Sequence, residues 1–481
     1  MPAANLGSIL SVGVYVPRLR LARATIAAAI AWANPHARMA ADGARAIGNW
    51  DEDALTMAVE ASRAALAGAA APPGALTLAS TSLPFADRDN ATLVASALDL
   101  PESLETLNAA ASLRAGTSAL AVAARRGNGV RSLVVASDLR PARPGSAQEL
   151  SYGDAAAALL VGPAARDGLA TVLATQHLAA DFVDHYRMSG AAFDYALEER
   201  WVRDEGYLKL VPRAITAALG AAGVAHAAVR QLVMAAPVAV ARRIAQLAGL
   251  GAAQLQDNLH QDVGDSGAAL PLLMLAGALD GAQPGDIIVA GGFGQGVDVL
   301  VLRADAGVAR RAARVAGAIA RRAEEPSYVR HLAHRGLVSV DFGKRAERDQ
   351  RTAHSVAWRK HRELAAFVGA RCRECATVQF PRSPVCVNPA CRATGTQDPY
   401  RLADSTGRVK SFTEDWQAYS ARPPFLYGNV EFSEGGNLLM EFTDAEPGEV
   451  AAGDTVRFVF RIKDEDRLRD FRRYFWKAVK V

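Results

Sequence analysis

The chain has 481 residues, of which 50% are hydrophobic, so it is long enough to enclose at least one large core. Its 54 basic and 50 acidic residues give a net charge of only +4, and so small and dispersed a charge argues against nucleic-acid binding. The longest apolar stretch near the N-terminus, residues 26–32, is far shorter than a membrane span and lacks a signal-peptide cleavage site, so no membrane association is expected.

From residue 8 to about residue 305, short apolar runs alternate with long alanine-rich helical patterns. Buried strands that alternate with amphipathic helices predict a layered α/β protein. The pattern occurs twice, with Gly-Asp-Ala-Ala-Ala at 153–157 closing one half and Gly-Gly-Phe-Gly-Gln-Gly-Val-Asp at 291–298 closing the other, which suggests an internal duplication. The predicted strands are 8–16, 76–80, 132–136, 155–161, 231–234, 286–290 and 297–303.

The composition changes twice after this region. Residues 306–360 are arginine-rich, with helical spacing over 306–325, and are predicted to form a solvated face or linker. From residue 361 onward, cysteines, prolines and alternating strands predict a small β-barrel. The predicted barrel strands are 408–414, 426–431, 437–442 and 455–461.

The four cysteines of the chain form two closely spaced pairs, Cys372-Arg-Glu-Cys375 and Cys386-Val-Asn-Pro-Ala-Cys391. Two thiolate pairs on adjacent turns are what a tetrahedral zinc site needs, and four sulfur ligands leave no open coordination position. We therefore predict a structural zinc ribbon rather than a catalytic zinc. Because no cysteine lies elsewhere, disulfides do not stabilise the fold, and a cytoplasmic location is expected.

Two motifs follow the cysteine region: Gln379-Phe-Pro-Arg382 and the strand Gly-Arg-Val-Lys-Ser-Phe-Thr that begins at Gly407. On these motifs, residues from about 355 to 481 resemble the zinc-ribbon/OB-fold proteins that accompany thiolases. The resemblance implies a rubredoxin-like zinc ribbon, a β-barrel OB-fold and a role as partner of acyl-CoA C–C bond enzymes. OB-folds also bind oligonucleotides, but this one lacks a basic, aromatic-rich strand face.

The N-terminal part resembles hydroxymethylglutaryl-CoA synthase of the archaeal and bacterial type, a member of the thiolase superfamily. The resemblance implies a thiolase-like α/β fold of two duplicated αβαβα halves, a coenzyme A thioester as ligand and a possible homodimer. It is carried by segments 13–18, 49–60, 114–117, 153–154 and 292–296. The expected domains are 1–345 (thiolase-like, halves about 1–165 and 166–305), 346–370 (linker helix), 371–395 (zinc ribbon) and 396–481 (OB-fold).

The resemblance also places the family's catalytic groups on residues of different chemistry. Its nucleophilic cysteine lies four residues before Thr117, where this chain has Leu113. Its glutamate falls on Thr81 and its histidine on Ala235, while an asparagine falls on Asp265. Loss of the nucleophile alone lowers the catalytic rate by ~10⁶-fold in some acyl-transfer enzymes. Ordinary synthase or thiolase turnover by this chain alone is therefore not expected.

Other residues are candidates for the missing chemistry. Ser112 adjoins Leu113, although adjacent residues on a turn point in different directions. In the polar run 181–203, Asp184, His185 and Tyr186 are candidate acid/base groups for a retro-aldol reaction on a β-hydroxyacyl-CoA, or alternatively members of a salt-bridge network. His260 stands alone and is interpreted as structural.

The loop that contains Gly292, Gly294 and Gly296 is predicted to let the backbone approach the substrate thioester. It leads into a strand instead of a helix, so it is not a dinucleotide fingerprint. Three hypotheses follow: a non-catalytic acyl-CoA-binding subunit that works with a thiolase, a cysteine-independent acyl-CoA aldolase, or a pure scaffold. The first is favoured, because thiolase, synthase-like and zinc-ribbon/OB subunits occur together in known complexes of these families.

Overall fold

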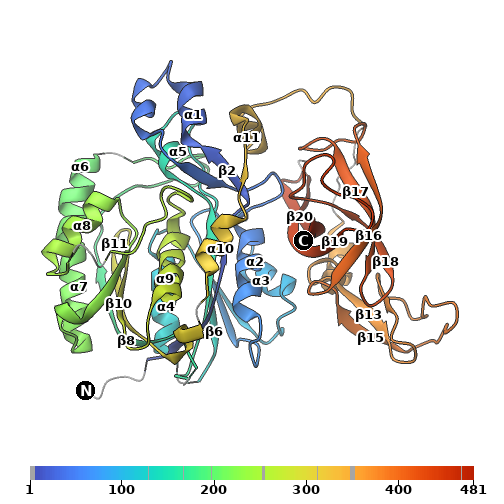
Figure 1. Cartoon of the computed structure of the whole chain (residues 1–481), viewed down its shortest axis with the longest axis horizontal. Coiled ribbons are helices and arrows are strands. Elements are labelled where there is room, and N and C mark those ends of the chain that lie inside the picture. The colour runs from blue at the N-terminus through green and yellow to red at the C-terminus, as the bar shows by residue number, and fades with distance from the viewer. Residues whose placement is uncertain are drawn as a thin grey trace. The chain divides into compact units, whose positions relative to one another are not determined.

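The computed structural model describes residues 6–127, 129–165, 167–196, 198–251, 255–310, 312–346, 353–466 and 468–481. The chain forms two compact units, which Figure 1 shows coloured along the sequence. The first comprises Met1–Gly48, Asp53–Thr92 and Pro101–Tyr328, and the second comprises Asn49–Glu52, Leu93–Leu100 and Val329–Val481. The second unit thus takes in two short segments from the N-terminal part of the chain. Residues 347–352 of the predicted linker helix lie outside the described residues, and the predicted domain boundaries stay a prediction.

The first unit is built on a nine-stranded sheet in the order β5-β4-β6-β7-β1-β8-β11-β10-β9. β1 and β8 pair at only two positions, so the sheet consists of two halves joined by a short contact. All seven strands predicted for this region are confirmed, while β5 and β8 were not predicted. The strands are β1 (Ser8–Tyr15), β4 (Ala75–Ala79), β5 (Glu105–Ala109), β6 (Ser132–Asp138), β7 (Ala155–Gly162), β8 (Ala170–Ala179), β9 (Val229–Met234), β10 (Ile287–Phe293) and β11 (Gly296–Ala304).

Helices cover both halves of this sheet and separate them. α4 (Ala115–Arg125) and α9 (Leu270–Gly281) each contact strands of both halves, and they lie between them in Figure 1. α9 is apolar on all sides, which a helix tolerates only when it is buried. α2 (Ala54–Leu66) packs on β1, β6 and β7, and α7 (Leu208–Ala222) packs on β8 and β11. The layers therefore follow the αβαβα order of a thiolase-like fold, as expected.

A small sheet, β12-β2-β3, and several short helices complete the chain before residue 335. The predicted helix over 306–325 is shorter than expected, since only Arg314–Ala320 is α-helical there. The elements are β2 (Leu19–Ala22), β3 (Ala44–Ile47), β12 (Ala323–Glu324), α1 (Arg23–Ile30), η1 (Pro35–Ala40), α3 (Asn90–Ala97), α5 (Ala147–Ser151), α6 (Glu199–Trp201), η2 (Val202–Tyr207, a π-helix), η3 (His226–Ala228), α8 (Val238–Leu247), η5 (Gly267–Ala269), η6 (Ala306–Arg310), α10 (Arg314–Ala320) and α11 (Tyr328–His334).

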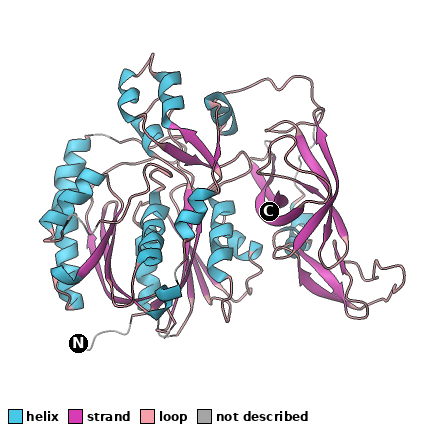
Figure 2. Ribbon diagram, in the orientation of Figure 1, coloured by secondary structure: helices cyan, strands magenta, loops and turns pink. Residues whose placement is uncertain are grey.

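The second unit contains the predicted ribbon and barrel, which are the mostly stranded part of Figure 2. The ribbon sheet has the order β14-β13-β15 and the barrel sheet the order β18-β17-β16-β19-β20. All four predicted barrel strands are confirmed, and the fifth, β20, was not predicted. The elements are α12 (His354–Arg359), α13 (His361–Leu364), β13 (Val368–Cys372), β14 (Val378–Gln379), β15 (Gln397–Arg401), β16 (Thr406–Asp415), β17 (Phe425–Phe432), β18 (Asn437–Glu441), β19 (Thr455–Asp466) and β20 (Phe471–Lys480).

Aromatic rings form the core of this second unit. The ring of Phe367, just before β13, lies 5.1 Å from the ring of Phe380 in the ribbon and 5.4 Å from that of Phe458 in β19. It also stacks on Trp476 of β20, whose indole nitrogen donates to the carbonyl of Ala365 at 2.7 Å. Because Phe367 contacts both parts, the ribbon and the barrel share one apolar core.

Candidate functional site

Leu113 lies just before α4, at the position where the resemblance puts a nucleophile. Its aliphatic side chain has no atom that attacks a thioester. The neighbouring Ser112 hydroxyl donates to the carbonyl oxygen of Gly294 at 2.9 Å and accepts from the Arg114 amide at 3.3 Å. Ser112 therefore joins the start of α4 to the glycine-rich loop between β10 and β11.

Two of the three candidate glycines, Gly292 and Gly294, lie against α4 and the turn before it, while Gly296 lies against the backbone of Leu178 in β8. A Cβ on Gly292 would lie 2.2 Å from the Thr117 hydroxyl oxygen, and one on Gly294 would lie 3.1 Å from the amide nitrogen of Leu113. Gly296 has a φ of +125°, which a side chain disfavours. Close packing on α4 accounts for Gly292 and Gly294, and the positive φ and the close approach to Leu178 account for Gly296, so a role in holding a thioester stays a prediction.

Asp298 of β11 is fully buried beneath the start of α4. Its carboxylate accepts from Arg114 Nη1 at 2.9 Å and also from the Ser118 hydroxyl. The His177 Nδ1 atom lies 2.7 Å away, and the His177 Nε2 atom lies 2.7 Å from Arg125 Nη1. Because a guanidinium only donates, Nε2 accepts and Nδ1–H donates to Asp298. The buried Asp298 carboxylate therefore accepts hydrogen bonds from the side chains of Arg114, Ser118 and His177.

Thr81, the position aligned with the glutamate, takes part in a network around the buried Asp138 at the end of β6. Its amide and hydroxyl donate to the Asp138 carboxylate at 2.7 and 3.0 Å. Ser80, Ser82 and the amide of Ala268 donate to the same carboxylate, each at 2.8 Å. A hydroxyl engaged in this way positions the backbone but cannot act as a base near neutral pH. The network brings Thr81 close to the segment that precedes α9.

Asp265, the position aligned with the asparagine, pairs with Arg140 at 2.9 Å. The Arg140 side chain is only 2% exposed, and it also contacts Asp194 at 3.2 Å. Its guanidinium carbon lies 3.4 Å from the ring centre of Tyr152, whose hydroxyl donates to Asp194 at 3.0 Å. Sequence reasoning did not single out Arg140, Tyr152 or Asp194, because nothing local in the sequence shows that they meet.

Part of the polar run 181–203 folds back onto Thr81 and Arg140. Tyr186 and Tyr195 pair through backbone hydrogen bonds of 3.0 and 2.8 Å, which close a hairpin. Within the hairpin Arg187 contacts Asp194 at 2.7 Å and donates to the carbonyl oxygen of Thr81. The predicted run therefore does reach the aligned positions, although its contacts there are made by Arg187 and Asp194.

The predicted acid/base candidates of this run lie next to the hairpin. His185 Nδ1 is 2.7 Å from the Asp184 carboxylate, and both side chains are mostly buried. Tyr186 is 47% exposed. The ring of Tyr207, at the end of the π-helix η2, is tilted against that of Phe293 at the end of β10, with the ring centres 4.2 Å apart. Burial raises the pKa of Tyr207, and Asp265 and Asp184 raise it further, so this phenol stays protonated.

Two further positions, Ala235 and His260, are explained by the structure around them. Ala235 follows β9 and packs against the core, in place of the aligned histidine. Burial lowers the pKa of His260, and the charge of Arg23 lowers it further. The carbonyl oxygen of His260 accepts from Arg23 Nη2 at 2.7 Å, which agrees with a structural residue.

The four cysteines form a cluster with the geometry of a metal site. Their sulfur atoms all lie within 4.8 Å of one another, and none forms a disulfide. The sulfur atoms of Cys372 and Cys391 are 3.9 Å apart and those of Cys375 and Cys386 are 3.5 Å apart. A tetrahedron with Zn–S bonds of about 2.3 Å has sulfur atoms about 3.8 Å apart, so the four donors fit zinc. The Thr396 hydroxyl lowers the pKa of the Cys372 thiol to about 6, whereas burial and the neighbouring thiols raise the pKa of Cys386, so the cluster forms its first thiolate at Cys372.

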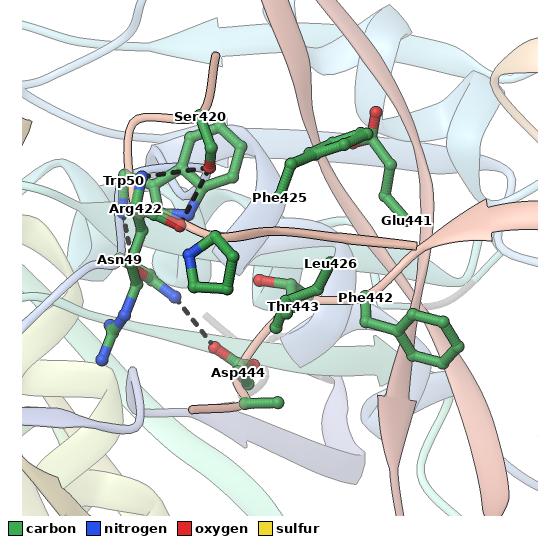
Figure 3. A pocket seen from close by; sticks show the side chains of 12 residues that line it. Asn49, Trp50, Ser420, Arg422, Phe425, Leu426, Glu441, Phe442, Thr443 and Asp444 are labelled. Atoms are coloured by element: carbon green, nitrogen blue, oxygen red, sulfur yellow. Dashed lines mark hydrogen bonds between the residues drawn. The ribbon is translucent and has the colours of Figure 1, made fainter. Parts of the chain in front are cut away.

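A pocket opens in the second unit, at the segment Asn49–Glu52 (Figure 3). Its lining includes Phe425, Leu426 and Phe442, together with Asp444. The Asp444 carboxylate accepts from Asn49 Nδ2 at 3.2 Å and pairs with the buried Arg461 at 3.0 Å. Because the Asp444 carboxylate is already bound by Asn49 and Arg461, it offers no free group to a ligand in this pocket.

Both parts of the chain match known families. The hydroxymethylglutaryl-CoA synthase of Aeropyrum pernix is 31% identical over 303 residues, which cover 59% of this chain and 80% of that protein. A DUF35 domain-containing scaffold protein of Methanocaldococcus jannaschii is 30% identical over 113 residues, 23% of this chain and 78% of that protein. The families "ChsH2, rubredoxin-like zinc ribbon domain" and "ChsH2, C-terminal OB-fold domain" match residues 365–397 and 400–461.

Solved structures show the same fold for the first unit. MvaS in complex with 3-hydroxy-3-methylglutaryl coenzyme A has a TM-score of 0.59 at 19% identity and covers 69% of this chain and 92% of its own. The 3-oxoacyl-(acyl carrier protein) synthase III of Pseudomonas aeruginosa PAO1 has a TM-score of 0.56 at 21% identity and covers 62% and 98%. Every helix in the described part of the chain is too short or too polar to span a lipid bilayer.

Proposed function

Because the chain belongs to the hydroxymethylglutaryl-CoA synthase family, we propose that it is an acyl-CoA-binding subunit that lacks the family's nucleophile and works with a separate thiolase. The joint reaction is a Claisen-type C–C bond cleavage, a condensation or an acyl transfer, for which the thiolase supplies the cysteine. The observation that carries the proposal is Leu113 at the start of α4, where an aliphatic side chain stands in place of that nucleophile.

Three further observations support a partnered role. Thr81 and Ala235 stand at the positions aligned with the other two catalytic groups, and neither supplies a base. The glycine-rich loop still packs closely on α4, so the architecture around the missing nucleophile is retained. Part of the chain is also similar to a protein of Methanocaldococcus jannaschii that is described as a scaffold protein.

The zinc in this proposal is structural. Cys372, Cys375, Cys386 and Cys391 would hold it with all four tetrahedral positions filled, so it contributes folding energy and leaves no position for a substrate. The ribbon that it closes shares its core with the OB-fold through Phe367. Zinc therefore stabilises the unit that we expect to meet the partner.

The proposal is tested by purifying the tagged full-length chain from its native host and identifying stoichiometric partners by mass spectrometry. Acyl-CoA cleavage and acyl transfer are then measured for the complex and for the chain alone. A thiolase that carries its own cysteine, with activity only in the complex, is the expected result. A homo-oligomer without a thiolase that cleaves a β-hydroxyacyl-CoA would contradict it. A complex that neither binds nor converts acyl-CoA would favour the pure scaffold instead.

A second candidate is a cysteine-independent acyl-CoA aldolase, and the placement of Tyr207 near Asp184 and Asp265 favours it. In a retro-aldol step a base removes the β-hydroxyl proton, the Cα–Cβ bond breaks to give a carbonyl compound, and the remaining CoA enolate takes a proton at Cα. Asp184, held by His185, would be the base, and the protonated Tyr207 would donate to the thioester oxygen.

This candidate is tested with the purified chain and a β-hydroxyacyl-CoA. Tyr207→Phe and His185→Ala should lower cleavage by about 10²-fold or more, as loss of an acid/base or oxyanion group does. Tyr195→Phe is the matched control, because Tyr195 is 52% exposed, lies on the same run and is not one of the candidate acid/base groups. Absence of cleavage by the wild-type chain would exclude this candidate.

A further inference from the structure

The sulfur atom of Cys372 has a hydroxyl group beside it. The Thr396 hydroxyl oxygen lies 3.3 Å from Cys372 Sγ, in a geometry in which either atom can donate. Thr396 comes just before β15, whose first residue, Gln397, pairs with Cys372 at the end of β13. The Arg373 amide also donates to the carbonyl oxygen of Thr396 at 2.9 Å. The backbone of the ribbon therefore fixes this hydroxyl next to the sulfur.

Metal binding decides which of the two atoms donates. A cysteine that binds a metal does so as a thiolate, so its sulfur has no proton and only accepts. The Thr396 hydroxyl keeps its proton, and its oxygen already accepts from the Gln397 side-chain amide, with Nε2 and Oγ1 3.4 Å apart. The hydroxyl proton of Thr396 is thus left for the sulfur.

A second threonine of the ribbon, Thr377, is arranged differently. Its hydroxyl oxygen lies 3.3 Å from Cys375 Sγ, but there the thiol is the donor. The same oxygen accepts from Asn388 Nδ2 at 3.2 Å. A contact in which the thiol donates is lost once the thiol gives up its proton to bind a metal. The two threonines therefore differ in what they offer to a metal-bound sulfur.

Cys372 needs a donor from within the protein. Four thiolates carry more negative charge than one divalent cation neutralises, and the excess lies on the sulfur atoms. Cys372 is 1% exposed, so water does not reach it to donate. Hydrogen bonds to an anion are about twice as strong as those between neutral groups. Groups that donate to metal ligands also orient them, and their loss typically lowers metal affinity about 10–100-fold.

We propose that Thr396 is a positioning residue of the metal site, whose hydroxyl donates to the Cys372 thiolate and holds that ligand on the metal. Thr396 itself does not bind the metal, so the inference adds to the four cysteine ligands. It also goes beyond the proposed function, because it concerns how the ribbon retains its metal and does not depend on acyl-CoA binding.

The first test replaces Thr396 by valine in the full-length chain, because valine has the shape of threonine but lacks the hydroxyl. Zinc affinity is measured by competition with a chelator of known affinity, and Thr396→Val should bind zinc about tenfold more weakly or worse. Thr396→Ser keeps the hydroxyl and should stay within about twofold of the wild type. Thr394→Val is the matched control, because Thr394 is an exposed threonine of the same ribbon.

A spectroscopic measurement separates a donated hydrogen bond from a merely structural role. Chains produced with cobalt in the growth medium carry Co²⁺ in place of zinc, and the sulfur-to-cobalt charge-transfer absorption reports the electron density on the sulfur atoms. Loss of a donor raises that density, so the absorption of Thr396→Val should move to longer wavelength. The absorption of Thr396→Ser and of Thr394→Val should stay where it is in the wild type.

An unshifted absorption in Thr396→Val would overturn the proposal, even with weaker zinc binding, since a change in packing would then explain the weaker binding. An equal shift in Thr396→Ser would overturn it as well. Thr396→Ala removes the same hydroxyl and should give the same shift, so it replaces the valine variant if thermal unfolding shows that the latter does not fold.

Discussion

Arg114 donates from Nη1 to the carboxylate of Asp298 at 2.9 Å and so joins the start of α4 to β11, across 184 residues of chain. The motif Arg-Ala-Gly-Thr, which survives here beside Leu113, thus has a structural explanation. A Cβ on Gly116 would lie 2.5 Å from the carbonyl oxygen of Ala268, so that glycine lets α4 approach the segment before α9. A sequence motif of a catalytic turn can persist without its nucleophile because it holds the two halves of the fold together.

Replacement of Arg114 by methionine should destabilise the chain, because it leaves the fully buried Asp298 carboxylate without its guanidinium partner. We expect a loss of about 2–4 kcal/mol in the free energy of unfolding, toward the lower end of the range for breaking buried pairs since His177 and Ser118 still donate. Urea unfolding measures this. The double variant Arg114→Met/Asp298→Asn should lose less than the sum of the two single variants, and strict additivity would contradict the pairing.

Leu113→Cys should restore a thiol at the start of α4 without restoring synthase activity. Thr81 is bound to Asp138 and Ala235 is apolar, so neither can move the protons of a condensation. Intact-mass analysis after incubation with acetyl-CoA would detect an acyl-enzyme, with the wild type as the control for the four ribbon cysteines. Condensation within about tenfold of an authentic synthase would show that the other two positions are not limiting.

The strands that the sequence predicted and those that it missed differ in burial. The run 155–161 is apolar throughout and became the buried β7. β5 (Glu105–Ala109) lies at the edge of the sheet and is only partly buried, so its residues need not be apolar. β20 (Phe471–Lys480) carries several charged residues, which interrupt its apolar run. Lys477 of β20 is nevertheless buried, and it is balanced by Asp51 at 3.0 Å. Such compensation by a distant residue leaves no signal in a local pattern.

The cysteine cluster could be predicted from local sequence, whereas the cluster around Arg140 could not. The cysteine ligands lie within 20 residues of one another, so their spacing alone predicted the cluster. Arg140, Asp194 and Asp265 come from three loops far apart in sequence and meet only because the strands and the hairpin bring those loops together. The run 181–203 was singled out for its polarity, but which of its side chains face Arg140 depends on the hairpin register of Tyr186 with Tyr195.

Cys375→Ser should remove zinc from the ribbon and unfold it, because three sulfurs hold zinc more weakly than four. We expect one zinc per wild-type chain by elemental analysis and well under one in the variant. Thermal unfolding should show an earlier transition for the variant and for the wild type treated with a chelator. An exposed substitution in the same ribbon, Arg373→Gln, should retain zinc. Full zinc content in Cys375→Ser would contradict the assigned ligands.

Glu149 should make the stability of the first unit depend on pH. The side chain is 1% exposed, and burial raises its pKa above the ordinary 4.5, although the Gly145 amide and the Tyr328 hydroxyl donate to it. The folded chain therefore keeps its proton at pH values where the unfolded chain has lost it. Stability from this group is present below pH 4.5 and is lost as the pH rises through the higher pKa of the folded state.

Glu149→Gln abolishes this titration, so the variant should gain stability relative to the wild type between pH 4.5 and pH 7. Urea midpoints of both proteins across that range measure the difference. Glu105→Gln, which removes a carboxylate that is 67% exposed, serves as the control for the change of one charge. Parallel profiles for Glu149→Gln and the wild type would contradict this prediction. They would show that Glu149 ionises alike in the folded and unfolded chains, so that its burial does not raise its pKa.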